Sequence, residues 1–282
     1  MLDHRIYTFL ELCKLMNYRK TAEVLNMTQP AVTQHIKYLE AEYGCKLFEY
    51  HSKVLTKTDK CMELEKHARA LVYADQSIIN HISESPITKV SIGATKTIGE
   101  YTIEEMVVRL LEREDIELHV IVDNTKHLLE QLNNLQLDFL MLEGYFDKNS
   151  YGYQLIRREK VVGICAKTHR FAGRKVSLEE VFQEHLIMRE EGSGTRSIFE
   201  HYLEDRNYSL DSFIRKSVIR SYKLIEKAVL EQLGISFVYQ AVADNCEFAM
   251  FEIMDSEIIH EFNYVFLKNV SLDKLFKKLG IN

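Results

Sequence analysis

Two short helical patterns joined by a three-residue connection constrain the fold of the first sixty residues most strongly. The first pattern covers Tyr18–Leu25, and Asn26-Met27-Thr28 follows it as a tight turn. In the second pattern Thr28 is suited to the N-cap, and Pro30 lies in the first turn, where a proline costs no hydrogen bond. Apolar residues recur at helical spacing on the inward faces: Ala22, Leu25, Val32, Ile36 and Leu39. Together with an amphipathic helix over residues 6–16, this predicts a helix-turn-helix.

The outward face of the second helix carries side chains that can hydrogen-bond to base edges or phosphates in the major groove of DNA. The residues predicted to contact DNA there are Thr28, Gln29, Pro30, Ala31, Thr33, Gln34 and Lys37. Gly44 is predicted to end the helix, and Lys46–Phe48 and Val54–Thr56 to form two short strands around a polar turn. Such a hairpin would be a wing whose His51 and Lys53 reach a phosphate or the minor groove.

Charge separates this segment from the rest of the chain. Residues 1–60 carry nine Lys and Arg against seven Asp and Glu, whereas the remaining 222 residues carry 27 against 35. The net charge of the whole chain is −6, which by itself argues mildly against a nucleic-acid partner. An excess of two positive charges indicates DNA binding only in combination with the helix-turn-helix pattern.

This N-terminal segment resembles the DNA-binding domain of LysR-type transcriptional regulators. The matching positions are Thr21–Glu40, Gly44, Leu47-Phe48 and Leu55-Thr56. The chain departs from the family at two positions, with Tyr50 where an Arg is usual and Asp59 where a Gly is usual. The resemblance implies a sequence-specific regulator that binds double-stranded DNA.

A heptad pattern follows the hairpin. Its members alternate at spacings of three and four: Cys61, Leu64, Ala68, Leu71, Asp75, Ile78 and Ile82. Spacing alone leaves two interpretations open, a seam that pairs with a second chain or an amphipathic helix packed on its own domain. The resemblance favours the first, because LysR-type regulators have a long linker helix here that pairs two subunits in a homodimer or homotetramer. Ser85-Pro86 is predicted to end the helix.

From residue 87 onward, strand patterns alternate with helical patterns, which predicts an α/β fold with a parallel sheet in two lobes. The predicted strands are Val90–Ala94, Leu118–Val122, Phe139–Leu142, Val161–Cys165, Leu186–Met188, Ser217–Ile219 and Ile235–Tyr239. Predicted helices include Ile98–Leu111, Thr125–Leu135 and Ser197–Leu203. This half resembles the effector domain of LysR-type regulators, which has a fold like periplasmic binding proteins.

The predicted organisation therefore has three parts. Residues 1–58 are a winged helix-turn-helix, residues 59–86 a linker helix, and residues 87–282 an effector-binding domain. Lobe I covers about 87–160 and 267–282, and lobe II about 161–266, with the loop 145–153 as the predicted boundary.

Two strand ends that lead into helices are predicted to bind a small anion, because ligands of such sheets bind beyond the carboxyl ends of strands near free helix amides. The first is Thr95-Lys96-Thr97, and the second is Gly192-Ser193-Gly194-Thr195-Arg196, where glycines let the backbone approach a ligand. Thr125 and Ser221 also open helices, and for them a plain N-cap is the alternative. The resemblance implies that Thr95–Thr97, Thr125 and Ser193–Thr195 line a cleft for a small metabolite, with no cofactor.

Other function classes have less support. An enzyme needs a paired acid and base, a nucleophile with its base, or a metal cluster, and no such spacing is present; Gly192-Ser193-Gly194 is not the G-x-S-x-G elbow. A secreted solute-binding protein would leave residues 1–60 unexplained and would need an export signal. The first twenty residues carry charges where a signal peptide is apolar, so we expect a cytoplasmic protein with no membrane partner.

A thiol-based redox regulator of the same fold remains the alternative. The five cysteines are an odd number and form no C-x-x-C pair, which predicts neither a disulfide framework nor a zinc site. Reduced thiols are therefore expected, with Cys165 buried inside an apolar strand and Cys246 exposed in a turn.

Overall fold

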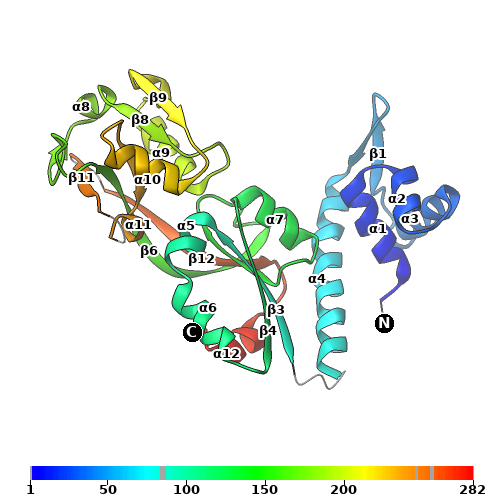
Figure 1. The fold of residues 1–282 in the computed structure, drawn as a ribbon. Helices are drawn as coiled ribbons and strands as arrows, with labels where there is room; N and C mark the ends of the chain where they lie inside the picture. The colour runs from blue at the N-terminus through cyan, green and yellow to red at the C-terminus, as the bar shows by residue number, and fades with distance from the viewer. Residues whose placement is uncertain (1, 83–86, 245–246, 255–256, 282) are drawn as a thin grey trace. The chain divides into compact units, whose positions relative to one another are not determined.

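The computed structural model describes residues 2–82, 87–244, 247–254 and 257–281. The predicted helix end at Ser85-Pro86 and the predicted exposure of Cys246 lie outside these ranges. The chain divides into two compact units (Figure 1). The first comprises Met1–Pro86, Ser150–Gly152 and Leu267–Asn282, and the second comprises Ile87–Asn149 and Tyr153–Phe266.

The first unit contains the predicted winged helix-turn-helix, formed by α1 (His4–Leu15), α2 (Tyr18–Val24), α3 (Gln29–Tyr43), β1 (Phe48–His51) and β2 (Val54–Lys57). The unit also contains α4 (Asp59–Ile82) and α12 (Asp273–Leu279). The helix-turn-helix is locally specified, because the Asn17 side chain accepts a hydrogen bond from the backbone of Lys20, and that of Thr28 accepts one from Ala31. Its core is made by side chains at most 1% exposed: Phe9, Leu12, Val32, Ile36, Leu39 and Leu47.

The first strand of the hairpin that follows α3 is displaced from its predicted position, whereas β2 begins at Val54 as predicted. β1 begins at Phe48 rather than Lys46 and continues to His51, which is paired with Val54. Only Ser52 and Lys53 remain for the turn, and both have positive φ, as the tightest hairpin turns require. His51 is therefore a strand residue and not part of the wing tip.

The helix α4 combines the two interpretations that its heptad pattern left open. Cys61 and Ala68 are fully buried, and the Cys61 sulfur lies 3.7 Å from that of Cys13 on α1, so the N-terminal part of α4 packs on its own domain. Leu71 and Ile78 are more than half exposed within this chain. The part of the seam beyond residue 70 thus has apolar side chains available for a partner.

The second unit is a mixed α/β domain (Figure 1). Its strands are β3 (Thr88–Thr95), β4 (Ile116–Asp123), β5 (Phe139–Glu143), β6 (Tyr151–Cys165), β7 (Lys175–Val176), β8 (His185–Met188), β9 (Arg215–Val218), β10 (Ser236–Tyr239), β11 (Ala249–Ile253) and β12 (Ile258–Leu267). Its helices are α5 (Lys96–Tyr101), α6 (Glu104–Leu111), α7 (Thr125–Asn133), α8 (Leu178–Phe182), α9 (Gly194–Glu204), α10 (Tyr222–Leu230) and α11 (Gln240–Asp244), with a 3₁₀ turn at Leu210–Ser212.

The large sheet runs in the order β4-β3-β5-β12-β6-β11-β7, and β10 also pairs with β6. We call β3–β5 with α5–α7 lobe I, and β7–β11 with α8–α10 lobe II. The strands β6 and β12 connect them, since β12 pairs with β5 at Phe262–Val265 while β6 pairs with β10 and β11 at Val161–Cys165. β8 and β9 form a separate parallel pair in lobe II.

Three predictions for this domain were wrong. The sheet is not purely parallel, because β12 returns antiparallel to β5, and β10 and β11 run antiparallel to β6. The predicted helix over residues 98–111 is two helices, interrupted where Ile103 turns into the core. The strand predicted to begin at Val161 begins ten residues earlier, because it continues from lobe I into lobe II.

Candidate DNA-binding and effector sites

The exposed face of α3 gathers the side chains predicted to contact DNA. Gln29, Pro30, Gln34 and Lys37 are exposed, and they follow Thr28, which caps the helix. Ala31 and Thr33 are only half-buried, and the Thr33 hydroxyl already donates a hydrogen bond to the backbone carbonyl of Gln29 at 3.0 Å. The two glutamines and Lys37 are therefore the side chains most available to base edges and phosphates.

Arg5 lies beside this face and was not predicted to take part in it. The Arg5 guanidinium lies 3.4 Å from the centre of the Tyr38 ring, and Tyr38 is itself about half exposed on α3. This cation–π contact places a positive charge from α1 next to the recognition face. Arg5 lies in an otherwise ordinary amphipathic helix, so no local pattern in the sequence indicates its position.

The wing offers less positive charge than predicted. Lys53 is exposed at the turn, but the His51 ring nitrogen lies 3.5 Å from the Glu49 carboxylate on the same strand. A carboxylate at that distance would compete with a phosphate for a protonated imidazole. Lys53 is thus the stronger candidate for a backbone contact, with Tyr50 exposed between Glu49 and His51.

In the second unit, a cluster of hydroxyl groups joins the two predicted effector segments. Thr97 at the start of α5 shares a hydrogen bond of 2.8 Å with the phenol of Tyr222, and Thr195 on α9 shares one of 3.1 Å with the same phenol. The two threonine hydroxyls are 3.5 Å apart, and all three residues are buried. We call Thr97, Thr195 and Tyr222 the hydroxyl cluster; it connects lobe I to lobe II.

Glu143 borders the hydroxyl cluster, and its sequence pattern did not mark it as a site residue. It ends β5 and is fully buried, which raises its pKa to about 8, although a hydrogen bond from Thr97 and the charge of Arg189 oppose that shift. One oxygen of its carboxyl group has no hydrogen-bond partner, and neither does the phenol oxygen of Tyr239. Buried polar atoms are rarely left unpaired in proteins, so both atoms are candidates to contact a ligand or ordered water.

Three cations surround the carboxylate of Glu190 next to the hydroxyl cluster. Arg189 binds it through two hydrogen bonds of 2.9 and 3.1 Å, while Lys96 and Arg220 each lie 3.8 Å away. Arg189 is nearly completely buried, and its guanidinium stacks 4.3 Å from the centre of the Tyr222 ring. We call Lys96, Arg189, Glu190 and Arg220 the charge cluster; its summed formal charge is positive.

The Gly192–Arg196 segment brings its backbone close to β5 but offers few free side-chain donors. A β-carbon on Gly194 would lie 2.5 Å from the carbonyl oxygen of Glu143, so only glycine allows this approach. Ser193 is buried and makes no capping hydrogen bond at the start of α9. Arg196 is engaged elsewhere, since it pairs with Glu200 at 2.9 Å.

The remaining predicted effector residues lie at helix starts. Thr95 is buried at the end of β3, where its hydroxyl donates to the carbonyl of Met141 at 3.4 Å. The N-cap of α7 is Asn124, not Thr125, whose hydroxyl is buried without a partner. Ser221 occupies the N-cap of α10 but makes no side-chain capping bond. The plain N-cap interpretation therefore does not account for the hydroxyl of Thr125 or of Ser221.

Neither a metal cluster nor a membrane span is found in the part of the chain that the structure describes. Within residues 2–82, 87–244, 247–254 and 257–281, no group of three or more His, Cys, Asp or Glu side chains is placed to hold a metal ion. In the same ranges no helix has the length and apolar character needed to cross a bilayer.

The cysteines that the structure describes are mostly shielded from solvent. Cys13, Cys61 and Cys165 are buried, and Cys45 is partly exposed. Burial raises the pKa of Cys13 and raises that of Cys165 to about 11. We therefore expect iodoacetamide at neutral pH to alkylate Cys45 before Cys13, Cys61 and Cys165, because a pKa near 11, as for Cys165, leaves roughly a hundredfold less thiolate than an ordinary cysteine. Peptide mass spectrometry over time checks this order.

In denaturant, all of these cysteines should react alike. Labelling of native Cys165 as fast as Cys45 would contradict the prediction and would support the redox alternative.

Comparison with known proteins agrees with both halves of the structure. Residues 4–61 match the family described as bacterial regulatory helix-turn-helix protein, lysR family, and residues 83–277 match the LysR substrate binding domain. The chain is 27% identical over 273 residues to the HTH-type transcriptional regulator CysL of Bacillus subtilis strain 168, covering 95% of this chain and 87% of that protein.

Solved structures share its fold. A hydrogen-peroxide-bound mutant of Corynebacterium glutamicum OxyR superposes with a TM-score of 0.62 at 20% identity, covering 99% of this chain and 90% of that one. The Synechocystis PCC6803 CcmR regulatory domain in complex with 2-PG gives a TM-score of 0.60 at 20% identity, covering 68% and 95%. With both family matches together spanning most of its length, the chain belongs to the LysR family of DNA-binding transcriptional regulators and is not an enzyme.

Proposed function

We propose that the chain is a sequence-specific, homo-oligomeric regulator whose binding to operator DNA responds to a small anionic metabolite held at the hydroxyl cluster and the charge cluster. The observation that carries the effector assignment is the position of Glu190. Its carboxylate is held by the buried Arg189, with Lys96 and Arg220 nearby. Glu190 thus occupies a place suited to an anion, and a ligand carboxylate or phosphate would compete for the same cations.

The hydroxyl cluster supplies the rest of the proposed recognition. The hydroxyls of Thr97 and Thr195 bond to Tyr222 and can turn toward a ligand, since a hydroxyl both donates and accepts. The unpartnered oxygens of Glu143 and Tyr239 would gain a partner from the same ligand. The complex of the CcmR regulatory domain with 2-PG supports a small-molecule ligand in a domain of this fold.

A ligand at this position can act as a switch because it contacts both lobes. The switch requires that the ligand bind one arrangement of the protein more tightly than the other. The lobes approach each other closely where Gly194 faces Glu143, so a change in the distance between the lobes would alter this backbone contact. We propose that this change alters how paired DNA-binding domains are placed on two half-sites.

The oligomer is supported by α4. Leu71, Ile78 and Ile79 are each more than half exposed within a single chain, which is unusual for three large apolar residues on one helix. A second copy of the helix would cover them, because Leu71 and Ile78 are one heptad apart and so lie on the same side of α4.

Ser193→Ala combined with Thr195→Ala is expected to abolish the response to the effector while leaving DNA binding within about twofold of the unaltered protein, since neither residue lies in the DNA-binding unit. The measurement is binding to the duplex upstream of the protein's own coding region, with and without a panel of monocarboxylates, dicarboxylates and phosphate esters.

Thr168→Ala, an exposed threonine after β6, is the matched control and should respond as the unaltered protein does. An unchanged response in the double variant would place the effector elsewhere. No response of the unaltered protein to any anion would contradict the anionic assignment.

A further inference from the structure

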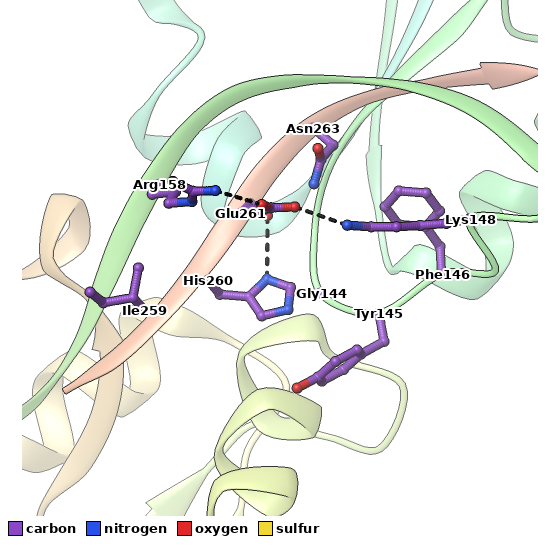
Figure 2. Close-up of a pocket in the computed structure, with 9 residues that line it drawn as sticks. All are labelled: Gly144, Tyr145, Phe146, Lys148, Arg158, Ile259, His260, Glu261 and Asn263. Carbon is purple, nitrogen blue, oxygen red and sulfur yellow. Dashed lines mark hydrogen bonds and ion pairs between the residues drawn. The ribbon is translucent and has the colours of Figure 1, made fainter. Parts of the chain in front are cut away.

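A cavity lies away from the proposed effector site, beside the strands that connect the lobes. It has a volume of about 330 Å³ and is lined by residues 144–146 and Lys148, by Arg158 on β6, and by residues 259–261 and Asn263 on β12 (Figure 2). This volume is at the lower end of the range for small-molecule sites in proteins.

Two polar side chains of the cavity, Glu261 and Asn263, are on the face of β12 opposite to the hydroxyl cluster. Glu143 is paired in register with Phe262, so their side chains share one face, where Phe262 packs 4.8 Å from the ring of Tyr239. Side chains alternate along a strand, so Glu261 and Asn263 project from the other face. The charged and amide groups of the cavity are therefore directed away from the hydroxyl cluster.

Charge in the cavity is positive. Lys148 lies 3.0 Å and Arg158 3.5 Å from the carboxylate of Glu261, which Figure 2 shows between them. Burial lowers the pKa of the neighbouring His260, so its imidazole adds no charge at neutral pH. Among the described residues that line the cavity, two cations thus face one carboxylate, which leaves one positive charge for an incoming anion.

Asn263 supplies an independent indication of a ligand. It is 1% exposed, and its side-chain oxygen has no hydrogen-bond partner. Figure 2 shows its amide nitrogen directed toward the ammonium of Lys148. The N–H group and the cation converge on one space and can both donate to the oxygens of an anion, while the unpartnered amide oxygen can accept from a protonated oxygen of the same ligand, such as the hydroxyl of hydrogen phosphate.

We propose that this cavity binds a small oxyanion, a carboxylate or a phosphate, between Lys148 and Asn263. The ring of Tyr145 borders the same space, packed 4.9 Å from the ring of His260, and offers an apolar surface to the remainder of the ligand. The site is independent of the effector site, because it shares no side chain with the hydroxyl cluster or the charge cluster.

Calorimetric titration of the full chain with sodium phosphate and with sodium acetate, at constant ionic strength, tests the proposal. Saturable heat is expected, and Lys148→Ala and Asn263→Leu should each weaken binding about tenfold or more, the factor expected for one hydrogen bond to a charged group. Both variants should fold, since Lys148 is half exposed and leucine fills the volume of the unpartnered amide; thermal melting verifies this.

Two variants locate the bound anion. Lys167→Ala removes an exposed lysine after β6 and should bind as the unaltered protein does, whereas Ser193→Ala with Thr195→Ala should remove only heat that comes from the proposed effector site and keep the heat that depends on Lys148 and Asn263. Saturable heat with phosphate but not with acetate identifies a phosphate site, and saturable heat with acetate but not with phosphate identifies a carboxylate site. The proposal is overturned if neither anion gives saturable heat, if Lys148→Ala and Asn263→Leu bind normally, or if only the Ser193 and Thr195 double variant loses binding.

Discussion

Replacing Gln29 and Gln34 together with alanine is expected to weaken binding to the cognate operator by about a hundredfold or more, because each lost base contact costs roughly 1–3 kcal/mol. Binding to random DNA of equal length should change by less than about threefold, since phosphate contacts supply that affinity. Both glutamines are exposed on α3, and alanine is a better helix former, so the fold should survive. Fluorescence anisotropy on both duplexes across a salt series measures the two effects.

Lys37→Ala is the contrasting variant on the same helix face. As a phosphate contact it should weaken binding to both duplexes alike and should reduce the dependence of affinity on salt by about one counterion. Equal losses on cognate and random DNA in the double glutamine variant would contradict base recognition by α3. In that case α3 would position the protein, and another element would identify the sequence.

The DNA-binding unit could be predicted almost completely because its determinants are local. The cap at Thr28, the proline in the next turn, the glycine at position 44 and the stripe of Val32, Ile36 and Leu39 all act within a few residues of one another. Each favours the same helix boundaries, so the prediction of α3 is confirmed. The first strand of the wing begins two residues later than predicted, because a short hairpin is fixed by the pairing around its turn, here Ser52 and Lys53, and not by composition.

The effector domain was less predictable because its determinants are distant in sequence. Thr97 and Thr195 were found through strand-to-helix junctions, but Tyr222, which joins them, lies 125 residues from Thr97 and has the pattern of an ordinary core tyrosine. The antiparallel return of β12 beside β5 likewise depends on a contact between segments more than a hundred residues apart. Strand alternation alone could not distinguish this mixed sheet from a parallel one.

The sequence nevertheless contained a pattern that could have marked Glu143 as a site residue. A glutamate directly after the apolar run Phe139–Leu142 either turns to solvent or is buried with its strand, and here it is buried. Likewise, Arg189 follows the apolar run of β8 and is held inside by Glu190 and Tyr222. Charged residues at the carboxyl ends of buried strands were therefore better markers of the candidate effector site than the glycines of residues 192–194.

Glu143→Gln is expected to make the effector domain less sensitive to pH. The native carboxyl group has a pKa of about 8 against 4.5 for an ordinary glutamate, because burial penalises its charged form. Between these values the native state keeps a proton that the unfolded state has released, so stability falls as pH rises, by at most about 1.4 kcal/mol per pH unit. The contribution of neutral Glu143 is complete below pH 4.5 and is lost as pH approaches 8.

Glutamine has nearly the same shape as glutamate and stays neutral, so Glu143→Gln removes the loss of stability with rising pH. From pH 5.5 to 7.5, the melting temperature of the effector domain in the full chain should fall by about 5 to 10 °C more in the unaltered protein than in Glu143→Gln, given about 2–4 °C per kcal/mol for a domain of this size. Differential scanning calorimetry in matched buffers provides the measurement. Glu204→Gln, on the exposed face of α9, is the control and should follow the unaltered protein.

The same protonation state bears on the proposed effector. A protonated Glu143 can donate a hydrogen bond to an anionic ligand, whereas an ionised one would repel it at close range in a buried site. Affinity for the anionic effector should therefore decline as pH rises toward 8 in the unaltered protein and much less so in Glu143→Gln. Parallel pH profiles for the two proteins, in stability and in ligand response, would mean that Glu143 is ionised throughout and that a cation or water pairs with its free oxygen.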